Sequence, residues 1–222
     1  MSADNDNKHA SRSARTRDRF IEVAQELFAE RSIDSVSLNE ITVAAGQKNR
    51  NALQYHFGSR DGLLQAIIDS HAPRVHALRE AWFAQPDSDA RTPAWAAARG
   101  LVHPLASYVQ ENESAVHYIK ILSQLAALNN HVLNPGVRSS LSFQSEERLQ
   151  AVMSEAIAHL PPAEAQRRLF LAVSITFHGM ADACRAHESA DANANLRERP
   201  ALFEQVALAV EALIDAPALE AP

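Results

Sequence analysis

Apolar residues recur every three or four positions along most of this chain, and prolines or glycines interrupt the pattern at intervals. In residues 16–31, Phe20, Ala24, Leu27 and Phe28 fall at i, i+4, i+7 and i+8, which places them on one face of a helix. Ala and Leu are abundant, whereas Val and Ile rarely follow one another, and this balance favours helices over strands. We therefore predict an all-α protein.

The interruptions divide the chain into an N-terminal region of three helices and a C-terminal region of about six helices. Residues 1–13 are polar and are predicted to be a disordered tail. The fourth helical pattern contains Pro73, which should kink it. The predicted helices cover about residues 16–31, 37–45, 49–57, 60–85, 93–110, 113–129, 138–160 and 163–188, with a last helix that has Pro200 in its first turn.

The second and third predicted helices are short and are separated by a glycine turn. Ser37 and Glu40 have the spacing of a capping box, in which the Ser37 hydroxyl accepts a backbone N–H and the Glu40 side chain bonds back. The helix that begins here is brief, because Gly46 can adopt the left-handed conformation that ends a helix. The next helix ends at Gly58. Two short helices joined by such a turn and preceded by a third form the layout of a helix-turn-helix DNA-binding region.

The side chains of the second short helix suit contact with DNA. Asn, Gln and Arg can bond to base edges in the major groove, and other polar groups can contact phosphates, which position the protein without specifying sequence. Leu53 and Phe57 are apolar and four residues apart, so they can anchor this helix on the first one. The polar residues at its start are Lys48, Asn49, Arg50 and Asn51, and those suited to phosphates are Tyr55, His56 and Arg60.

Residues 16–64 resemble the DNA-binding region of the TetR family of repressors. The most specific match is the block Tyr-His-Phe-Gly-Ser-Arg-Asp at residues 55–61, followed by Leu63 and Leu64. Three features depart from the family pattern: Arg31 and Ser32 stand where a glycine usually closes the first helix, Thr42 replaces a small residue, and the turn before Leu53 is one residue longer. The DNA-binding residues predicted from the resemblance and the chemistry together are Thr16, Arg17, Ser37, Leu38, Lys48, Asn49, Arg50, Asn51, Gln54, Tyr55, His56 and Arg60.

The resemblance also implies a domain organisation and a mechanism. Residues 14–60 would form the helix-turn-helix DNA-binding domain, and residues 61–222 a helical domain for ligand binding and dimerisation. The implied function is a ligand-responsive repressor whose dimer binds a palindromic operator and is released by a small, largely apolar effector. Because Pro73 interrupts the helix that joins the two domains, we hypothesise that a ligand moves this helix and changes the spacing of the two DNA-binding domains.

Two sets of residues in the C-terminal domain are candidates for the effector pocket and the dimer interface. Polar groups among apolar and aromatic ones are typical of small-molecule sites, although the same residues could simply fill the core. Long apolar stripes on the last two helices fit a two-fold four-helix bundle. The pocket candidates are Trp82, His103, Tyr108, His117, Ile121, Gln124, Phe143 and Phe177, and the interface candidates are Leu169, Val173, Phe177, Met180, Leu202, Val206, Val210 and Leu213.

Charge does not argue against nucleic acid once it is mapped. The net charge is -6, but residues 1–62 hold nine basic and nine acidic side chains, so the acidic excess lies beyond them. Residues 8–19 carry five basic side chains against one acid. Charges further apart than a Debye length of about 10 Å are largely screened, so a locally basic edge can still meet phosphates.

Several other classes of protein are disfavoured by the sequence. The ten histidines include no pair at i, i+4 with a nearby acid, and there is no cysteine cluster, so we expect no metal and no cofactor. No nucleophile elbow, phosphate loop or dinucleotide fingerprint points to an enzyme. No stretch is long and apolar enough to span a membrane, and with Cys184 as the single cysteine we expect a cytoplasmic protein. The alternatives left open are a protein that kept the fold but lost DNA binding, a helical enzyme, and an activator in place of a repressor.

Overall fold

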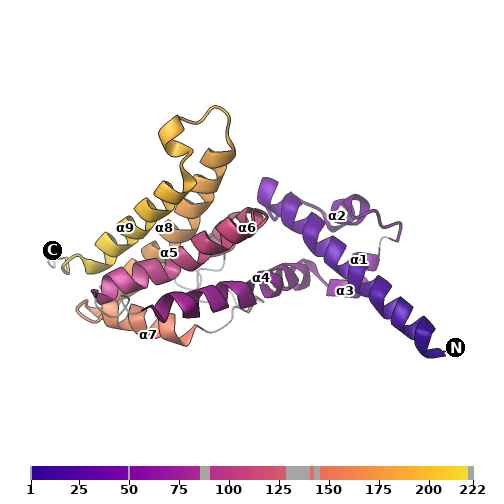
Figure 1. The fold of residues 1–222 in the computed structure, drawn as a ribbon, viewed down its shortest axis with the longest axis horizontal. Helices are drawn as coiled ribbons and strands as arrows, with labels where there is room; N and C mark the ends of the chain where they lie inside the picture. Colours follow the sequence, from indigo (N-terminus) through magenta and orange to yellow (C-terminus); the bar gives the residue numbers. More distant parts are fainter. Residues whose placement is uncertain (1, 50, 86–90, 129–140, 143–145, 220–222) are drawn as a thin grey trace. The chain divides into compact units, whose positions relative to one another are not determined.

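The computed structural model describes residues 2–49, 51–85, 91–128, 141–142 and 146–219, and over these residues every regular element is a helix (Figure 1). The predicted all-α class is thus confirmed. The chain forms two compact units: residues 1–70 with 140–142, and residues 71–139 with 143–222. The division falls inside α4 (Arg60–Phe83) and not at its start, where the functional boundary is predicted. Among the described residues, no helix is both long and apolar enough to cross a membrane.

The first unit is built on α1 (Ser2–Glu30), α2 (Leu38–Ala44), α3 (Ala52–Phe57) and the first part of α4. Its core contains Phe20 and Phe28 from α1 and Ile41 from α2, all fully buried, together with Leu53 from α3. The helix α1 begins at Ser2, so the prediction of a disordered tail over residues 1–13 is wrong for the described part of that segment. No proline or glycine occurs before Glu30, and a helix that is already nucleated by packing extends easily through such residues.

Only half of the capping box predicted for α2 forms. The Ser37 hydroxyl accepts a hydrogen bond from the backbone N–H of Glu40 at 3.1 Å, as expected. The Glu40 carboxylate is instead bound by the guanidinium of Arg31, which stands where the family usually has a glycine. Gly46 has a φ of 71°, so it ends the helix in the left-handed region as predicted.

The junction between α3 and α4 is a tight turn that depends on two glycines. The backbone oxygen of Phe57 accepts from the N–H of Ser59 at 2.8 Å, and Gly58 between them has φ 72° and ψ -43°. These values describe a γ-turn with positive φ, a strained conformation for residues with a Cβ. The Ser59 hydroxyl caps α4 by accepting from the N–H of Gly62 at 3.1 Å. A Cβ on Gly62 would overlap the Phe57 oxygen, so this turn can close only if residue 62 is glycine.

The second unit contains the rest of α4 with α5 (Pro93–Glu111), α6 (Ala115–Leu128), α7 (Glu147–Ala156), α8 (Pro162–Glu188) and α9 (Arg199–Asp215). A short 3-10 turn, η2 (Ala194–Leu196), precedes α9. The helix α9 packs along both α8 and α5, α6 packs on α8, and α7 packs on α5 (Figure 1). In the described part of this unit, the helices agree with the prediction of about six.

The helix predicted for residues 138–160 is wrong in its first part. The helix α7 begins at Glu147, and Leu141 and Ser142 are not helical, whereas 138–140 and 143–145 lie outside the described residues. The reason is that the Gln65 side chain bonds the backbone N–H and oxygen of Ser142, which in a helix would bond to other backbone groups. The amide of Gln65 accepts from the N–H of Ser142 at 2.7 Å and donates to its oxygen at 2.9 Å.

Stability of the second unit should depend on pH through the buried His71. Its Nδ1 lies 2.6 Å from the Tyr108 hydroxyl, and its ring stacks on Tyr118 with centroids 4.3 Å apart. Burial, helped by the nearby charge of His117, lowers the pKa of His71 from 6.5 to about 4. Between pH 6.5 and about 4 the unfolded chain binds a proton at His71, whereas the folded protein does not. The folded state therefore keeps its full stability above pH 6.5 and becomes less stable as the pH falls towards 4.

We expect the free energy of unfolding to fall by up to about 3 kcal/mol over that interval through this one group. His71→Gln keeps a partner for Tyr108 but does not titrate, so it should lose that part of the acid sensitivity. Both tryptophans, Trp82 and Trp95, lie in the second unit, so their fluorescence during urea unfolding at pH 7 and at pH 4.5 measures the effect. An identical loss of stability in the variant would contradict it.

Candidate nucleic-acid interface

The third helix begins later than the sequence predicts, at Ala52 and not near Asn49. The Asn49 side-chain oxygen accepts from the N–H of Asn51 at 3.0 Å, and the Asn49 backbone oxygen accepts from the N–H of Ala52, also at 3.0 Å. Asn side chains that bond local backbone in this way compete with helix formation. Lys48, Asn49 and Asn51 therefore lie in the turn before α3, and Arg50 lies outside the described residues.

The helix α3 has one face buried and one face in solvent. Leu53 is buried and Phe57 half-buried, with its ring edge-on to Phe20 at 6.1 Å, as expected of the two anchoring residues. On the other side Gln54 is exposed and Tyr55 is 83% exposed. The turn residues Lys48, Asn49 and Asn51 are exposed as well. The first unit thus presents a polar surface that is backed by a packed core and consists of Lys48, Asn49, Asn51, Gln54 and Tyr55.

His56 and Arg60, predicted as phosphate contacts, are largely engaged inside the first unit. The His56 ring is half-buried, 5.9 Å from the ring of Phe20. The Arg60 guanidinium donates to the backbone oxygen of Ile33 and lies 6.0 Å from the Phe28 ring. Both side chains hold neighbouring segments in place, and their contact with phosphate stays a prediction.

The predicted residues in the middle of α1 and at the start of α2 lie at the surface of the first unit. The Thr16 hydroxyl donates to the backbone oxygen of Arg12 at 3.0 Å, and the Arg17 guanidinium lies 5.3 Å from the centre of the Phe57 ring. Arg17 is exposed, so its charge can meet a phosphate while its contact with Phe57 fixes its position. Ser37 is exposed and Leu38 half-buried at the beginning of α2.

Sequence reasoning missed one exposed residue of this surface, Val43 on α2, which is 68% exposed. Its neighbours Ile41 and Thr42 are buried, and the Thr42 hydroxyl donates to the backbone oxygen of Leu38 at 2.8 Å. An apolar side chain that lies off the buried face of a short amphipathic helix is the signal that could have found it. In a helix-turn-helix, such a group can contact the methyl of a thymine.

Comparison with known proteins supports one family. A sequence model described as "Bacterial regulatory proteins, tetR family" matches residues 20–67, the segment that contains α2, α3 and their packing partners. The HTH-type transcriptional regulator AcrR of Shigella flexneri is 26% identical over 160 residues, which cover 69% of this chain and 70% of that protein. These matches support a transcriptional regulator of the TetR family, with the segment that matches the family model at residues 20–67.

Solved structures of TetR-type proteins are also similar to this chain. A TetR-family transcriptional regulator from Streptomyces coelicolor is 20% identical, with a TM-score of 0.43, 90% of this chain and 82% of that chain being covered. A transcriptional regulator of the TerR/AcrR family from Aquifex aeolicus VF5 is 19% identical, with a TM-score of 0.39 and coverage of 88% and 98%. The match of residues 20–67 supports a DNA-binding transcriptional regulator.

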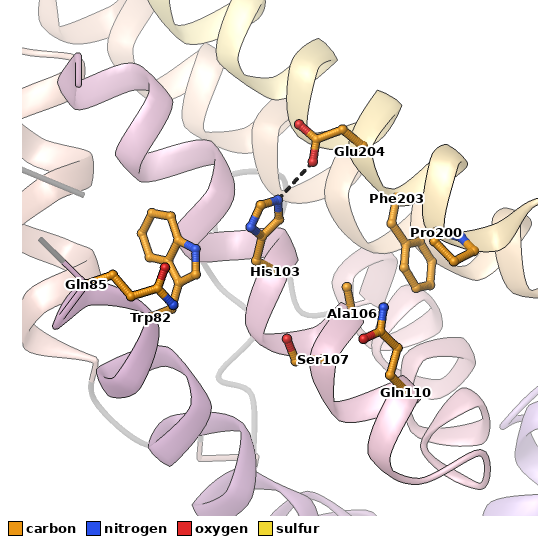
Figure 2. A pocket seen from close by; sticks show the side chains of 9 residues that line it. All are labelled: Trp82, Gln85, His103, Ala106, Ser107, Gln110, Pro200, Phe203 and Glu204. Carbon is orange, nitrogen blue, oxygen red and sulfur yellow. Dashed lines mark hydrogen bonds and ion pairs between the residues drawn. The ribbon is translucent and has the colours of Figure 1, made fainter. Parts of the chain in front are cut away.

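The second unit has a pocket of about 340 Å³ between the end of α4, the second half of α5 and the beginning of α9 (Figure 2). Trp82 and His103, both predicted as pocket residues, line it together with Gln85, Ala106, Ser107, Gln110, Pro200, Phe203 and Glu204. Of the other candidates, Tyr108 and Ile121 are buried in the core, and Phe143 lies outside the described residues. His117, Gln124 and Phe177 are half-buried and do not line this pocket.

An ion pair forms one wall of the pocket. His103 Nε2 lies 2.9 Å from Glu204 (Figure 2). Arg99 donates to the other oxygen of Glu204 at 2.7 Å. Burial alone would raise the pKa of Glu204, but the hydrogen bonds from His103 and Arg99 outweigh it and hold this pKa below its ordinary value. The Trp82 ring stands edge-on to His103, with centroids 6.0 Å apart. The pocket therefore combines an aromatic wall with fixed polar groups.

The predicted interface residues on α8 and α9 divide into two groups. Met180, Val206 and Val210 are buried within the single chain, so they belong to its core and not to its surface. The reason is that α8 and α9 pack against each other and so cover part of both stripes. Leu169, Val173, Phe177, Leu202 and Leu213 are half-buried. The large apolar residues that remain exposed are Leu171 on α8 and Leu208 on α9, at 42% and 43%.

Proposed function

We propose that this TetR-family regulator is a homodimeric repressor, that it binds a palindromic operator, and that a small effector releases it. The observation that carries the DNA-binding part is the exposed polar surface of Lys48, Asn49, Asn51, Gln54 and Tyr55. It lies opposite a buried apolar face, within the segment that matches the family model. Lys48, Asn51 and Gln54 would contact DNA from the turn and from α3. Repression is proposed over activation because the family resemblance favours it.

Dimerisation through α8 and α9 is supported by the composition of the exposed face of α9. From Ala201 to Ala212 that face carries no charged side chain, and it consists of Ala201, Gln205, Leu208, Ala209 and Ala212. The two glutamates in this part of α9, Glu204 and Glu211, lie off that face and form ion pairs with Arg99 of α5. A solvent-facing helix is normally charged on its outer side, whereas interfaces between like subunits are depleted of charge.

The pocket in the second unit supports a small-molecule effector. Its aromatic residues Trp82 and Phe203 suit a largely apolar ligand, and Gln85, Ser107 and Gln110 can orient it. Because Trp82 and Gln85 belong to or directly follow α4, a ligand that contacts them can bias this helix. Such a bias requires that the ligand prefer one of two states of the protein.

The DNA-binding part is tested by fluorescence anisotropy with a labelled duplex from the promoter of its own gene, at several salt concentrations. A steep fall in affinity with salt is expected, since phosphate contacts release counterions. Lys48→Ala should weaken binding severalfold and reduce the log–log salt slope by about one. Arg91→Gln removes an exposed charge from the second unit and serves as the matched control. If no duplex binds even at low salt, the chain has kept the fold without the function.

The effector part is tested by titrating candidate ligands into the protein–operator complex. Trp82 fluorescence reports occupancy of the pocket, and gel shift reports the affinity for the operator. A ligand that fills the pocket should release the DNA, and Trp82→Ala should abolish that release. A ligand that quenches Trp82 and leaves operator affinity unchanged would rule the mechanism out.

A further inference from the structure

A cluster of metal-ligating side chains lies in the second unit, outside both the pocket and the DNA-binding surface. His76 and Glu80 are four residues apart on α4, so they lie on one face of the helix. Glu146, at the beginning of α7, faces them. One ligand atom from each of the three residues can be chosen so that all lie within 4.8 Å of one another. His76 Nδ1 and Glu146 Oε2 are already 2.8 Å apart.

The two oxygens of Glu146 have different partners, and this matters for what the cluster can hold. Arg79, a buried residue, donates to Oε1 of Glu146 and to the backbone oxygen of Gly100. Oε2 faces His76. A carboxylate that is fixed through one oxygen and ligates through the other is a common arrangement in metal sites, because the outer hydrogen bond orients the ligand. The two carboxylates of Glu80 and Glu146 outnumber the single guanidinium of Arg79, which favours a cation.

We propose that His76, Glu80 and Glu146 bind a divalent first-row transition metal ion, with Zn²⁺ as the best fit. One imidazole nitrogen and two carboxylate oxygens are ligands that Zn²⁺ accepts, and water can complete a four-coordinate site. Bonds of about 2.0–2.1 Å would place the ligand atoms about 3.3 Å apart. His76 and Glu146 are close to that separation, and Glu80, which is exposed on α4, supplies the adjustable third ligand.

The ion would join α4 to α7. His76 and Glu80 follow Pro73 on α4, where the backbone lacks an N–H to donate to the oxygen of Asp69. An ion that binds the folded state stabilises it in proportion to the logarithm of its concentration, so the second unit should melt at a higher temperature in its presence. This site needs neither DNA nor an organic effector, and it therefore stands or falls separately from the proposed function.

Sequence reasoning passed over this cluster because it searched for paired histidines. The spacing of His76 and Glu80 is visible in the sequence, but a histidine and a glutamate four residues apart are common on solvated helices. Glu146 comes from a segment far along the chain, and only the packing of α7 brings it to α4.

The experiment uses the full chain, stripped with chelator, and Co²⁺ as a spectroscopic probe. Addition of Co²⁺ should produce visible absorption bands of a four- or five-coordinate ion, Zn²⁺ should displace them, and Zn²⁺ should raise the melting temperature. His76→Gln and Glu80→Gln should each weaken Co²⁺ binding about tenfold or more. Glu155→Gln on α7 removes one exposed carboxylate outside the cluster and should leave the bands unchanged.

Metal-free melting curves show whether each variant is folded, and the exposed position of Glu80 makes its variant the safest one. Absence of the bands would mean that Arg79, His76 and Glu146 form only a structural ion-pair network, and it would overturn the proposal. Bands that survive unchanged in both the His76 and the Glu80 variants would place the ion on other residues and would overturn it equally.

Discussion

Gly62→Ala is expected to unfold the first unit and to abolish DNA binding while the second unit stays folded. The added Cβ would overlap the backbone oxygen of Phe57, and its next nearest atom, the Phe57 carbonyl carbon, would be 3.1 Å away. A backbone oxygen that is already held in the turn by Ser59 cannot move aside as the end of a flexible side chain can. We expect a cost of about 3 kcal/mol or more, the upper range for overpacking.

The two units can be followed separately in this experiment. Far-UV circular dichroism reports helices of both units, whereas Trp82 and Trp95 report only the second. Gly62→Ala should therefore lose part of its helical signal at low urea and keep the tryptophan transition of the unsubstituted protein. A single unchanged transition by both probes, with normal binding to the operator, would contradict the prediction.

Gly58→Ala provides a graded comparison at the same junction. A Cβ on Gly58 meets no atom within 4 Å, so its cost comes only from the positive φ of 72°. Such conformations cost about 1–3 kcal/mol for a residue with a Cβ. Gly58→Ala should thus lower the free energy of unfolding by less than Gly62→Ala does. The opposite order would show that the turn tolerates the steric clash at residue 62 better than a positive φ at residue 58.

The sequence predicts those features of this fold that depend on neighbours along the chain. Ser37 caps α2, Gly46 ends it, Ser59 caps α4 and Pro200 lies in the first turn of α9, because each of these effects involves residues within one helical turn. The periodicity of Phe20, Ala24 and Phe28 likewise identified the buried face of α1. Local rules act at short range, and so a single sequence is sufficient for them.

The features that could not be predicted from the sequence are side-chain contacts. They depend on partners that are distant along the chain, or on rotamers that only the packing determines. Glu40 turns to Arg31 and not back to its own cap, and Gln65 takes the backbone of Ser142 out of a predicted helix. Tyr108 is predicted to line the pocket because it is aromatic and has a polar hydroxyl. In the structure this hydroxyl is hydrogen-bonded to His71 in the core. Helical spacing gives the face on which a side chain lies, and it does not give the helix that covers that face.

The dimer proposal gives the second large expected effect. Leu208→Glu places a charge at the centre of the uncharged exposed face of α9, where Leu208 is 43% exposed. In a symmetric pair the same position occurs on both subunits, so two carboxylates would be buried close together without partners. We expect a monomer by size-exclusion chromatography with light scattering. Operator affinity should fall about a hundredfold or more, because a monomer can occupy only one half-site.

Leu196→Glu is the matched control, since Leu196 is likewise an exposed leucine, at 50%, and lies in η2 outside the α8 and α9 faces. It should remain dimeric and bind DNA normally. Leu208→Glu should keep the melting temperature of a folded second unit when extrapolated to low protein concentration, because the substituted side chain faces away from the core. If Leu208→Glu stays dimeric with unchanged affinity, the subunits do not pair through α9, and its uncharged face must then be explained by a different partner.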